Sequence, residues 1–363
     1  MSTVRFSQHP RTIFLELLYG CNLYCSYCYI GKQRNHTKPF VPAFEVTLDI
    51  LKQLKVEQVD EVVLLGGEPM LHPRFLDICM AMADLDFSYR GVVTNGTVMT
   101  QEKASLLQRL GFWVDISFRG PDAEIFDAIA GKEGTFWKAF NAALLLSQAG
   151  MPVGIEFDCI PQNYEKLYTT IEMLVRDGVR IKQLQLHRIM PEGDAQKKTD
   201  EFFLSLPQWH TVFEQAARIR DTFDISVVFE DGFPLCLIEP AYREMITPCP
   251  CGFTLLTVAP NGDVRYCPCH SETLGNIRQE TLASIWQNSL TQYRDTARHP
   301  AVCLSCDLFE ICRGGCSASG GARMDDGMDI FQQDFRPIML EPEQRETPKE
   351  RKMIIGQQVC SIV

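Results

Sequence analysis

The sequence has no apolar run long enough to cross a membrane, and its N-terminus lacks the charged-then-apolar pattern of an export signal. It also lacks an excess of basic residues, because 35 Lys and Arg stand against 46 Asp and Glu, a formal net charge of −11 at pH 7. Nucleic-acid binding needs a basic face that neutralises phosphates, so this charge disfavours nucleic acid as a partner. We therefore predict a cytoplasmic protein that binds neither membranes nor nucleic acid.

Cysteine, in contrast, is abundant, with 15 cysteines among 363 residues. Without an export signal, metal or cluster ligation is a better explanation than a disulfide framework. The cysteines are also grouped: three lie at residues 21–28, nine lie at residues 236–316, and one lies near the C-terminus. Only two are isolated, Cys79 and Cys159. This grouping predicts at least two separate ligand sites.

The first group has the spacing Cys21-x3-Cys25-x2-Cys28 and follows a predicted buried strand, Thr12–Leu18. Three thiolates on one loop can hold three irons of a [4Fe–4S] cluster, which normally takes four protein cysteines. The remaining iron is then open to a small molecule, as in an open catalytic metal site. A structural zinc, or an ordinary cluster completed by a distant cysteine, is the alternative.

A second motif, Gly66-Gly67-Glu68-Pro69, ends the predicted strand Glu61–Leu65. The two glycines allow the backbone to approach a ligand closely, and the Glu68 carboxylate is suited to an ammonium group. Alone, this motif would indicate only a turn.

Together the two motifs resemble those of the radical S-adenosylmethionine (SAM) family. The resemblance implies that Cys21, Cys25 and Cys28 bind a [4Fe–4S] cluster whose open iron chelates the amino and carboxyl groups of SAM. It also implies that the Gly66–Pro69 segment contacts SAM, and Tyr27 matches the aromatic residue usually found before the third cysteine.

Residues 1–230 alternate strand-like and helix-like segments, and 45% hydrophobic content is enough for two domains with cores of their own. Six or seven β-α units in a row imply a parallel sheet with right-handed crossovers. Because this is too few for a closed eight-stranded barrel, we predict a partial (β/α)6 TIM-like barrel, which the resemblance also implies. The chemistry then belongs at the C-terminal ends of the strands. A second, cysteine-rich domain is predicted over residues 231–363.

Several further residues fall at predicted strand ends. Asn95, before Gly96, is either turn chemistry or part of the SAM site. Ser117 resembles a family serine that contacts SAM, in a segment where Arg119 replaces a common aspartate. Arg119 either binds a substrate carboxylate or phosphate, or is a substitution at the protein surface with no functional role. Cys159 is a weak candidate for a hydrogen-atom donor, and a buried inert cysteine is the better interpretation.

The C-terminal region has the array Cys303-x2-Cys306-x5-Cys312-x3-Cys316. Upstream, Cys251 is followed by a predicted hairpin with an Asn261-Gly262 turn, and Cys267 lies just after it. This arrangement resembles the SPASM domain, an extension of some radical SAM enzymes that usually carries two auxiliary iron–sulfur clusters. A zinc-ribbon-like module is the alternative.

The resemblance also implies a ligand set for each auxiliary cluster. The first takes Cys249, Cys251, Cys267 and Cys316, and the second takes Cys303, Cys306, Cys312 and Cys360. Two further cysteines leave these sets open. Cys269 could replace a neighbour as ligand, and Cys236 could replace Cys249.

As a family member, the protein would cleave SAM reductively to a 5′-deoxyadenosyl radical that abstracts hydrogen from a substrate. A flavodoxin- or ferredoxin-like protein would donate the electron. We expect oxidation, crosslinking or epimerisation of a ribosomally made peptide, and the alternative is an amino-acid- or sugar-derived metabolite. The first strand begins near Thr12, so a leader-binding function is expected either on a separate protein or not at all. A non-catalytic iron–sulfur carrier or sensor is the remaining alternative, and the Gly66–Pro69 motif disfavours it.

Overall fold

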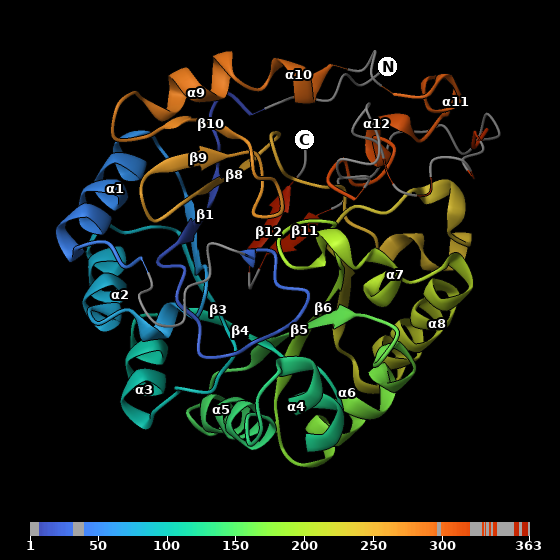
Figure 1. The fold of residues 1–363 in the computed structure, drawn as a ribbon, viewed down its shortest axis with the longest axis horizontal. Coiled ribbons are helices and arrows are strands. Elements are labelled where there is room, and N and C mark those ends of the chain that lie inside the picture. The colour runs from blue at the N-terminus through green and yellow to red at the C-terminus, as the bar shows by residue number, and fades with distance from the viewer. Residues whose placement is uncertain are drawn as a thin grey trace.

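The fold is built on a curved sheet whose strands lie inside a ring of helices (Figure 1). The computed structural model describes residues 7–31, 40–295, 299–319, 329, 331, 334 and 337–339, and the backbone of 352–355 and 358–361. Within this part of the chain, the strands are β1 (Thr12–Glu16), β2 (Glu61–Leu65), β3 (Tyr89–Thr94), β4 (Trp113–Ser117), β5 (Val153–Cys159), β6 (Ile181–Arg188), β7 (Ser226–Phe229), β8 (Leu255–Val258), β9 (Asp263–Arg265), β10 (Thr273–Asn276), β11 (Lys352–Ile355) and β12 (Gln358–Ser361).

The described strands form one 10-stranded sheet in the order β10-β9-β8-β1-β2-β3-β4-β5-β6-β7, and β11 and β12 form a separate pair. The neighbours from β1 to β7 pair in parallel, with Thr12 opposite Glu61 at the start of the ladder. Strand β8 also pairs in parallel with β1, whereas β9 and β10 are antiparallel. Three strands of the cysteine-rich region therefore extend the sheet of the N-terminal half.

Helices cover the outer face of this sheet (Figure 1). The described α-helices are α1 (Phe44–Val56), α2 (Phe75–Asp84), α3 (Gln101–Arg109), α4 (Ala123–Ala130), α5 (Phe136–Gln148), α6 (Leu167–Arg176), α7 (Thr199–Phe202), α8 (Leu206–Phe223), α9 (Leu282–Asn288), α10 (Thr291–Arg294), α11 (Ala301–Leu304) and α12 (Phe309–Cys312). Helix α1 buries Ile50, Leu51 and Leu54, as its spacing of apolar residues requires. None of the helices in these ranges is long and apolar enough to cross a membrane.

The predicted partial barrel is confirmed. The predicted strand Glu61–Leu65 agrees with β2 at both ends, and the predicted strand Thr12–Leu18 extends two residues beyond β1. The Thr100 hydroxyl caps α3 by accepting the N–H of Lys103 at 3.2 Å. From the sequence, Asn163 is expected to cap the helical segment after β5, but its side chain makes no capping hydrogen bond. Its side chain is buried and donates to the carbonyl oxygens of Arg119 and Asp158. Asn163 therefore connects the ends of two neighbouring strands.

Candidate functional site

One large cavity lies at the C-terminal ends of the parallel strands, where the fold class places chemistry. Its empty volume is about 1790 Å³, including the part open to solvent. Cysteines from both ends of the chain line it: Cys21, Cys25, Cys28, Cys249, Cys251, Cys267, Cys269 and Cys316. Thus the fold brings the first cysteine group next to part of the second.

The first three cysteines lie on the loop between β1 and α1. Backbone hydrogen bonds fix this loop, because the Cys28 carbonyl accepts the N–H of Gly31 at 3.2 Å and that of Asp194 at 2.9 Å. The Cys21 sulfur accepts the N–H of Leu23 at 3.4 Å. Burial, helped by the charge of Glu68, raises the pKa of Cys21 to about 12. Without a bound cation this thiol therefore stays protonated, whereas a coordinating metal would deprotonate it.

The glycine pair after β2 packs against this cysteine loop. The Gly67 N–H donates to the Leu18 carbonyl at 2.8 Å, and a Cβ on Gly67 would lie 1.9 Å from the Gly20 carbonyl oxygen. Gly66 has a φ of +124°, and its Cβ would lie 2.5 Å from the Leu18 oxygen. These glycines are therefore required for close contact with the chain's own backbone. Both also line the cavity, so their predicted contact with SAM stays a prediction.

Glu68 is fully buried, and its carboxylate is used within the protein. One oxygen accepts the Thr94 hydroxyl at 2.7 Å and the Met70 N–H at 3.1 Å, and the other accepts the Asn95 N–H at 2.8 Å. Burial raises the pKa of Glu68 despite these bonds. The structure thus gives no support for the predicted contact with an ammonium group, and Glu68 connects the loops after β2 and β3. Pro69 follows it as the first residue of a short 3-10 helix, Pro69–Leu71.

Asn95 and Ser117 both line the cavity, at the ends of β3 and β4. The Asn95 side chain donates to Asn22 at 3.0 Å, and its oxygen accepts the Thr97 N–H at 2.9 Å. Asn95 therefore both stabilises the turn after β3 and forms part of the cavity wall. The Ser117 carbonyl accepts a hydrogen bond from Arg119 at 3.1 Å.

Tyr27, Arg119 and Asp158 form a buried polar group on the same wall. The Tyr27 hydroxyl donates to Asp158 at 2.9 Å, and burial raises its pKa. Burial of Arg119 acts to lower its pKa, but the nearby charges of Cys25, Tyr27 and Asp158 outweigh it and raise the pKa. Arg119 is only 6% exposed, so its interpretation as a substitution at the protein surface is wrong.

Cys159 is absent from the wall of the large cavity. It is 1% exposed and lines a smaller cavity of about 260 Å³ with Phe202 and Trp209. Burial raises its pKa well above the ordinary value. The structure supports the interpretation as an inert buried cysteine and gives no support for hydrogen-atom donation to a substrate in the large cavity.

Five cysteines of the C-terminal region share the large cavity: Cys249, Cys251, Cys267, Cys269 and Cys316. A hydrogen bond from the Cys251 thiol lowers the pKa of Cys249. Burial raises the pKa of Cys269 and of Cys316. Because Cys269 is half-buried and lines the same cavity as its neighbours, the structure leaves it open as a ligand of the first auxiliary cluster.

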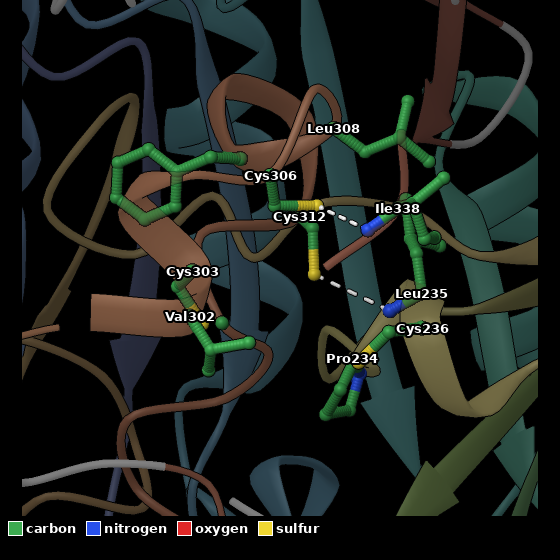
Figure 2. A pocket seen from close by; sticks show the side chains of 11 residues that line it. Pro234, Leu235, Cys236, Val302, Cys303, Cys306, Leu308, Cys312 and Ile338 are labelled. Carbon is green, nitrogen blue, oxygen red and sulfur yellow. Dashed lines mark hydrogen bonds between the residues drawn. The ribbon is translucent and has the colours of Figure 1, made fainter. Parts of the chain in front are cut away.

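The remaining described cysteines of this region surround a second cavity of about 320 Å³ (Figure 2). They are Cys236, Cys303, Cys306 and Cys312. The expectation that Cys236 could replace Cys249 is therefore not supported, because Cys236 lines the other cavity. Cys360 lies in β12 opposite Met353, and its side chain is outside the described residues.

The donor set at both cavities fits iron–sulfur clusters. All fourteen cysteines in the described part of the chain are thiols rather than disulfides. No group of three Cys, His, Asp or Glu side chains in that part of the chain is close enough together to hold a single metal ion. Sets of thiolates are the ligands of iron–sulfur clusters, which the two cavities can accommodate.

Comparison with known proteins decides the family. A sequence model described as "Radical SAM superfamily" matches residues 15–174, and the SPASM model, described as "Iron-sulfur cluster-binding domain", matches residues 249–307. The chain is a member of the radical SAM superfamily with a SPASM domain. This radical SAM protein is accordingly an enzyme that uses SAM and a [4Fe–4S] cluster, and its SPASM domain binds auxiliary iron–sulfur clusters.

Curated relatives of this radical SAM enzyme match most of its length. The AdoMet-dependent heme synthase of Methanosarcina barkeri is 25% identical over 347 residues, 90% of this chain and 96% of that protein. The PqqA peptide cyclase of Rhizobium meliloti is 25% identical over 355 residues, with coverages of 93% and 92%. Mycofactocin maturase MftC of Mycolicibacterium smegmatis is 29% identical over 327 residues, with coverages of 85% and 79%.

Two solved structures share the fold. Streptococcus suis SuiB bound to precursor peptide SuiA has a TM-score of 0.72 at 17% identity, over 89% of this chain and 75% of that chain. Native anSMEcpe with bound AdoMet has a TM-score of 0.64 at 18% identity, over 88% of this chain and 93% of that chain. At these identities the likeness is one of fold alone.

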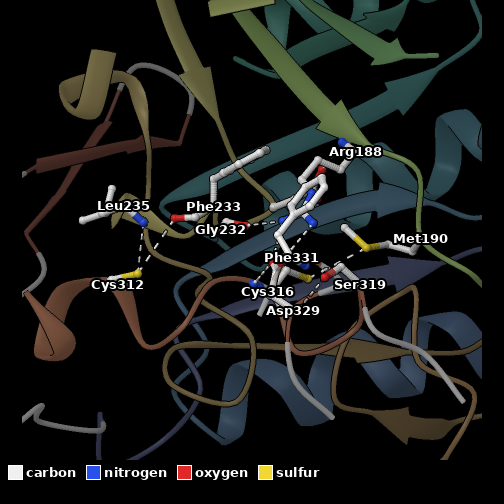
Figure 3. Close-up of polar contacts among 11 residues, drawn as sticks. Arg188, Met190, Gly232, Phe233, Leu235, Cys312, Cys316, Ser319, Asp329 and Phe331 are labelled. Carbon is white, nitrogen blue, oxygen red and sulfur yellow. Dashed lines mark hydrogen bonds and ion pairs between the residues drawn. The ribbon is translucent and has the colours of Figure 1, made fainter. Parts of the chain in front are cut away.

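The barrel and the SPASM region of this radical SAM enzyme are joined by a buried ion pair (Figure 3). Arg188, at the end of β6, donates to both oxygens of Asp329 at 2.7 and 3.1 Å. Asp329 also accepts the Cys316 N–H at 3.1 Å. Arg188 thus positions a cysteine 128 residues further along the chain through Asp329. No motif in the sequence indicates this pair, because neither residue belongs to a recognisable pattern.

Proposed function

We propose that this radical SAM enzyme modifies a ribosomally made peptide by oxidation, crosslinking or epimerisation. The large cavity carries this proposal. Thiols of both cysteine regions line this one cavity, and it is open to solvent. Cofactors and a segment of a long substrate can therefore meet in it. Four relatives at 25–27% identity are named PqqA peptide cyclase, which supports the same substrate class.

In this proposal the cavity residues divide between cluster and SAM binding. Cys21, Cys25 and Cys28 hold the first cluster. Bound together and reduced, cluster and SAM supply an organic radical that removes hydrogen from a substrate carbon. The residues proposed to contact SAM are Gly66, Gly67, Asn95, Ser117 and Tyr27. Glu68 and Pro69 position the loop that carries the glycines.

Tyr27, Arg119 and Asp158 form a polar part of the cavity wall next to the first cysteine group. Because Arg119 keeps its charge beside Cys25, it stabilises negative charge on the sulfurs there. Tyr27 is held in place by its bond to Asp158.

The C-terminal cysteines are proposed to bind the auxiliary clusters. Cys249, Cys251, Cys267 and Cys316 hold the first, with Cys269 as the alternative for one of them. Cys303, Cys306 and Cys312 are three ligands of the second. Since the first set shares the large cavity with the SAM site, it is close enough to the substrate to receive an electron or to contact it.

In this proposal the chain is divided into two functional parts. Residues 1–230 form the radical SAM part and residues 231–363 the SPASM part, with β8 to β10 of the second part joined to the sheet of the first. A flavodoxin- or ferredoxin-like protein donates the electron. The enzyme works in the cytoplasm, where its many thiols stay reduced.

The proposal is tested with the anaerobically loaded enzyme, a strong reductant, SAM, and a deuterated synthetic peptide encoded by a short reading frame beside the gene. We expect transfer of deuterium into 5′-deoxyadenosine and a mass change in the peptide. Steady SAM cleavage that leaves every neighbouring peptide unchanged would contradict the peptide proposal.

Oxidation or epimerisation of a small metabolite is the second candidate. It is favoured by the 25% identical relative that is named a heme synthase, which matches 96% of its own length. If this candidate is correct, deuterium reaches 5′-deoxyadenosine from a labelled metabolite and not from a peptide.

A further inference from the structure

The second cavity contains one cysteine more than the Cys303-x2-Cys306-x5-Cys312 array provides. Cys236 reaches it from a segment 67 residues upstream of Cys303 (Figure 2). It is carried by η5, a short 3-10 helix over Leu235–Leu237 that follows β7. Four sulfurs from two distant parts of the chain therefore border the same space, and four is the number of cysteines that a fully ligated [4Fe–4S] cluster takes.

The segment that carries Cys236 is fixed to the array by hydrogen bonds. The Leu235 N–H donates to the Cys312 sulfur at 3.3 Å, and that thiol lies 4.0 Å from the Phe233 carbonyl (Figure 3). On the other side, the Arg243 side chain donates to the carbonyls of Leu235 and Ile238 at 3.1 and 3.0 Å. Cys236 is therefore held in position on both sides.

The surroundings of the four thiols suit an iron–sulfur cluster. Apart from the cysteines, mostly apolar side chains line this cavity, including Val302, Leu308 and Phe309. Backbone N–H groups of Leu235 and Ile338 point at two of the sulfurs, each at 3.3 Å. Hydrogen bonds to the sulfurs are one of the features by which proteins tune a cluster's reduction potential.

We propose that Cys236 is the fourth protein ligand of the second auxiliary cluster, with Cys303, Cys306 and Cys312, in the place assigned by family resemblance to Cys360. This inference rests on the proposed function in one respect, that a second auxiliary cluster is present. It assigns that cluster to electron transfer, because four protein ligands leave no open iron for a substrate.

The test replaces single cysteines in a chain that lacks the first cluster through Cys21→Ala, Cys25→Ala and Cys28→Ala. Into it we introduce Cys236→Ala, Cys360→Ala or, as a control, Cys79→Ala, which removes a buried thiol of α2 outside both cavities. Iron and sulfide per chain, and the electron paramagnetic resonance of the reduced protein, are measured after anaerobic loading. We expect Cys236→Ala to lose the iron of one cluster and its signal, and Cys360→Ala and Cys79→Ala to keep both. Loss with Cys360→Ala and retention with Cys236→Ala overturns the inference.

A measurement without substitutions guards against variants that fail to fold. The fully loaded enzyme is treated anaerobically with iodoacetamide, before and after the iron is removed by a chelator, and the modified cysteines are mapped by mass spectrometry. Protection of Cys236 that ends when the iron leaves, with Cys360 modified in both states, supports the inference. The reverse pattern contradicts it. Protection of Cys236 in an enzyme that acts on no peptide would sink only the proposed function.

Discussion

At the scale of single residues, Glu68 accepts three hydrogen bonds from its own chain. Its carboxylate therefore holds neighbouring loops together. The sequence correctly indicated that Gly66–Pro69 lies at the end of a strand beside the cysteine loop. It could not show where the carboxylate points, because two partners of Glu68, at the end of β3 and directly after it, are 26 and 27 residues away. Cys236 was misplaced for the same reason, since spacing along the chain does not reveal which cavity a thiol lines.

Replacing Glu68 by Gln should destabilise the protein although the shape is kept. The amide nitrogen must face the N–H of either Asn95 or Met70, and neither backbone donor can turn away. A buried donor without a partner costs about 1–3 kcal/mol. Denaturation midpoints check this, with the exposed Glu102→Gln of α3 as the control, for which we expect no change. Equal midpoints for the two variants would refute the role given to Glu68.

At the scale of elements, the sequence predicted the strands and most helices because their apolar periodicity is local. It missed α4, whose eight residues follow Pro121 and a capping Asp122. It also did not predict that β8 pairs with β1, since the partners Thr12 and Leu255 are far apart in the chain. Sheet neighbours of this kind depend on tertiary packing, which no single segment records.

Because the loops after β1 and β2 are in close contact, we expect Gly67→Ala to lower the stability of the protein strongly. A Cβ there meets backbone at 1.9 Å, so one of the two loops must move. Gly134→Ala is the matched control, because Gly134 has a φ of +71° and open space around it. That control should cost only the strain of a left-handed residue, about 1–2 kcal/mol. We expect a clearly lower denaturation midpoint and less iron per chain for Gly67→Ala, and similar values for both variants would contradict the packing argument.

Asp127 of α4 predicts a pH-dependent contribution to stability. Its carboxylate accepts the Thr135 hydroxyl and the backbone N–H groups of Gly134, Thr135 and Phe136, before and at the start of α5. Partial burial acts to raise its pKa, but these bonds outweigh it and lower the pKa.

Because the folded pKa is below that of the unfolded chain, the extra stability is present above the unfolded value of about 3.9 and is lost as the pH falls through the folded value. Asp127→Asn should therefore cost about 1 kcal/mol at pH 7 and progressively less below about pH 4. Unfolding measured from pH 7 to pH 3 checks this. A difference between the two proteins that is independent of pH would contradict it.

For the whole molecule, the shared sheet and the Arg188–Asp329 pair join the SPASM region to the barrel. Asp329 is fully buried and Arg188 nearly so, and Arg188 also lies over the Phe233 ring at 4.6 Å. Composition and motifs predicted two cysteine-bearing regions, but only the folded chain shows that thiols of both regions line one cavity.

Asp329→Asn should loosen this connection. Leaving one member of a buried ion pair without its counter-charge costs roughly 3–5 kcal/mol. We expect a lower thermal midpoint of the loaded enzyme and faster loss of iron from the auxiliary cluster at Cys316. Asp177→Asn, which breaks an exposed pair with Arg176, is the control and should leave both unchanged. A midpoint for Asp329→Asn equal to that control would contradict the proposed connection.

The most direct test of the central claim is the amount of 5′-deoxyadenosine formed by the anaerobically loaded, reduced enzyme with SAM. The account predicts turnover by the unmodified chain and none by the Cys21→Ala, Cys25→Ala, Cys28→Ala variant, while that variant keeps its auxiliary iron. Equal formation of 5′-deoxyadenosine by both proteins would contradict the assignment of SAM chemistry to the first three cysteines.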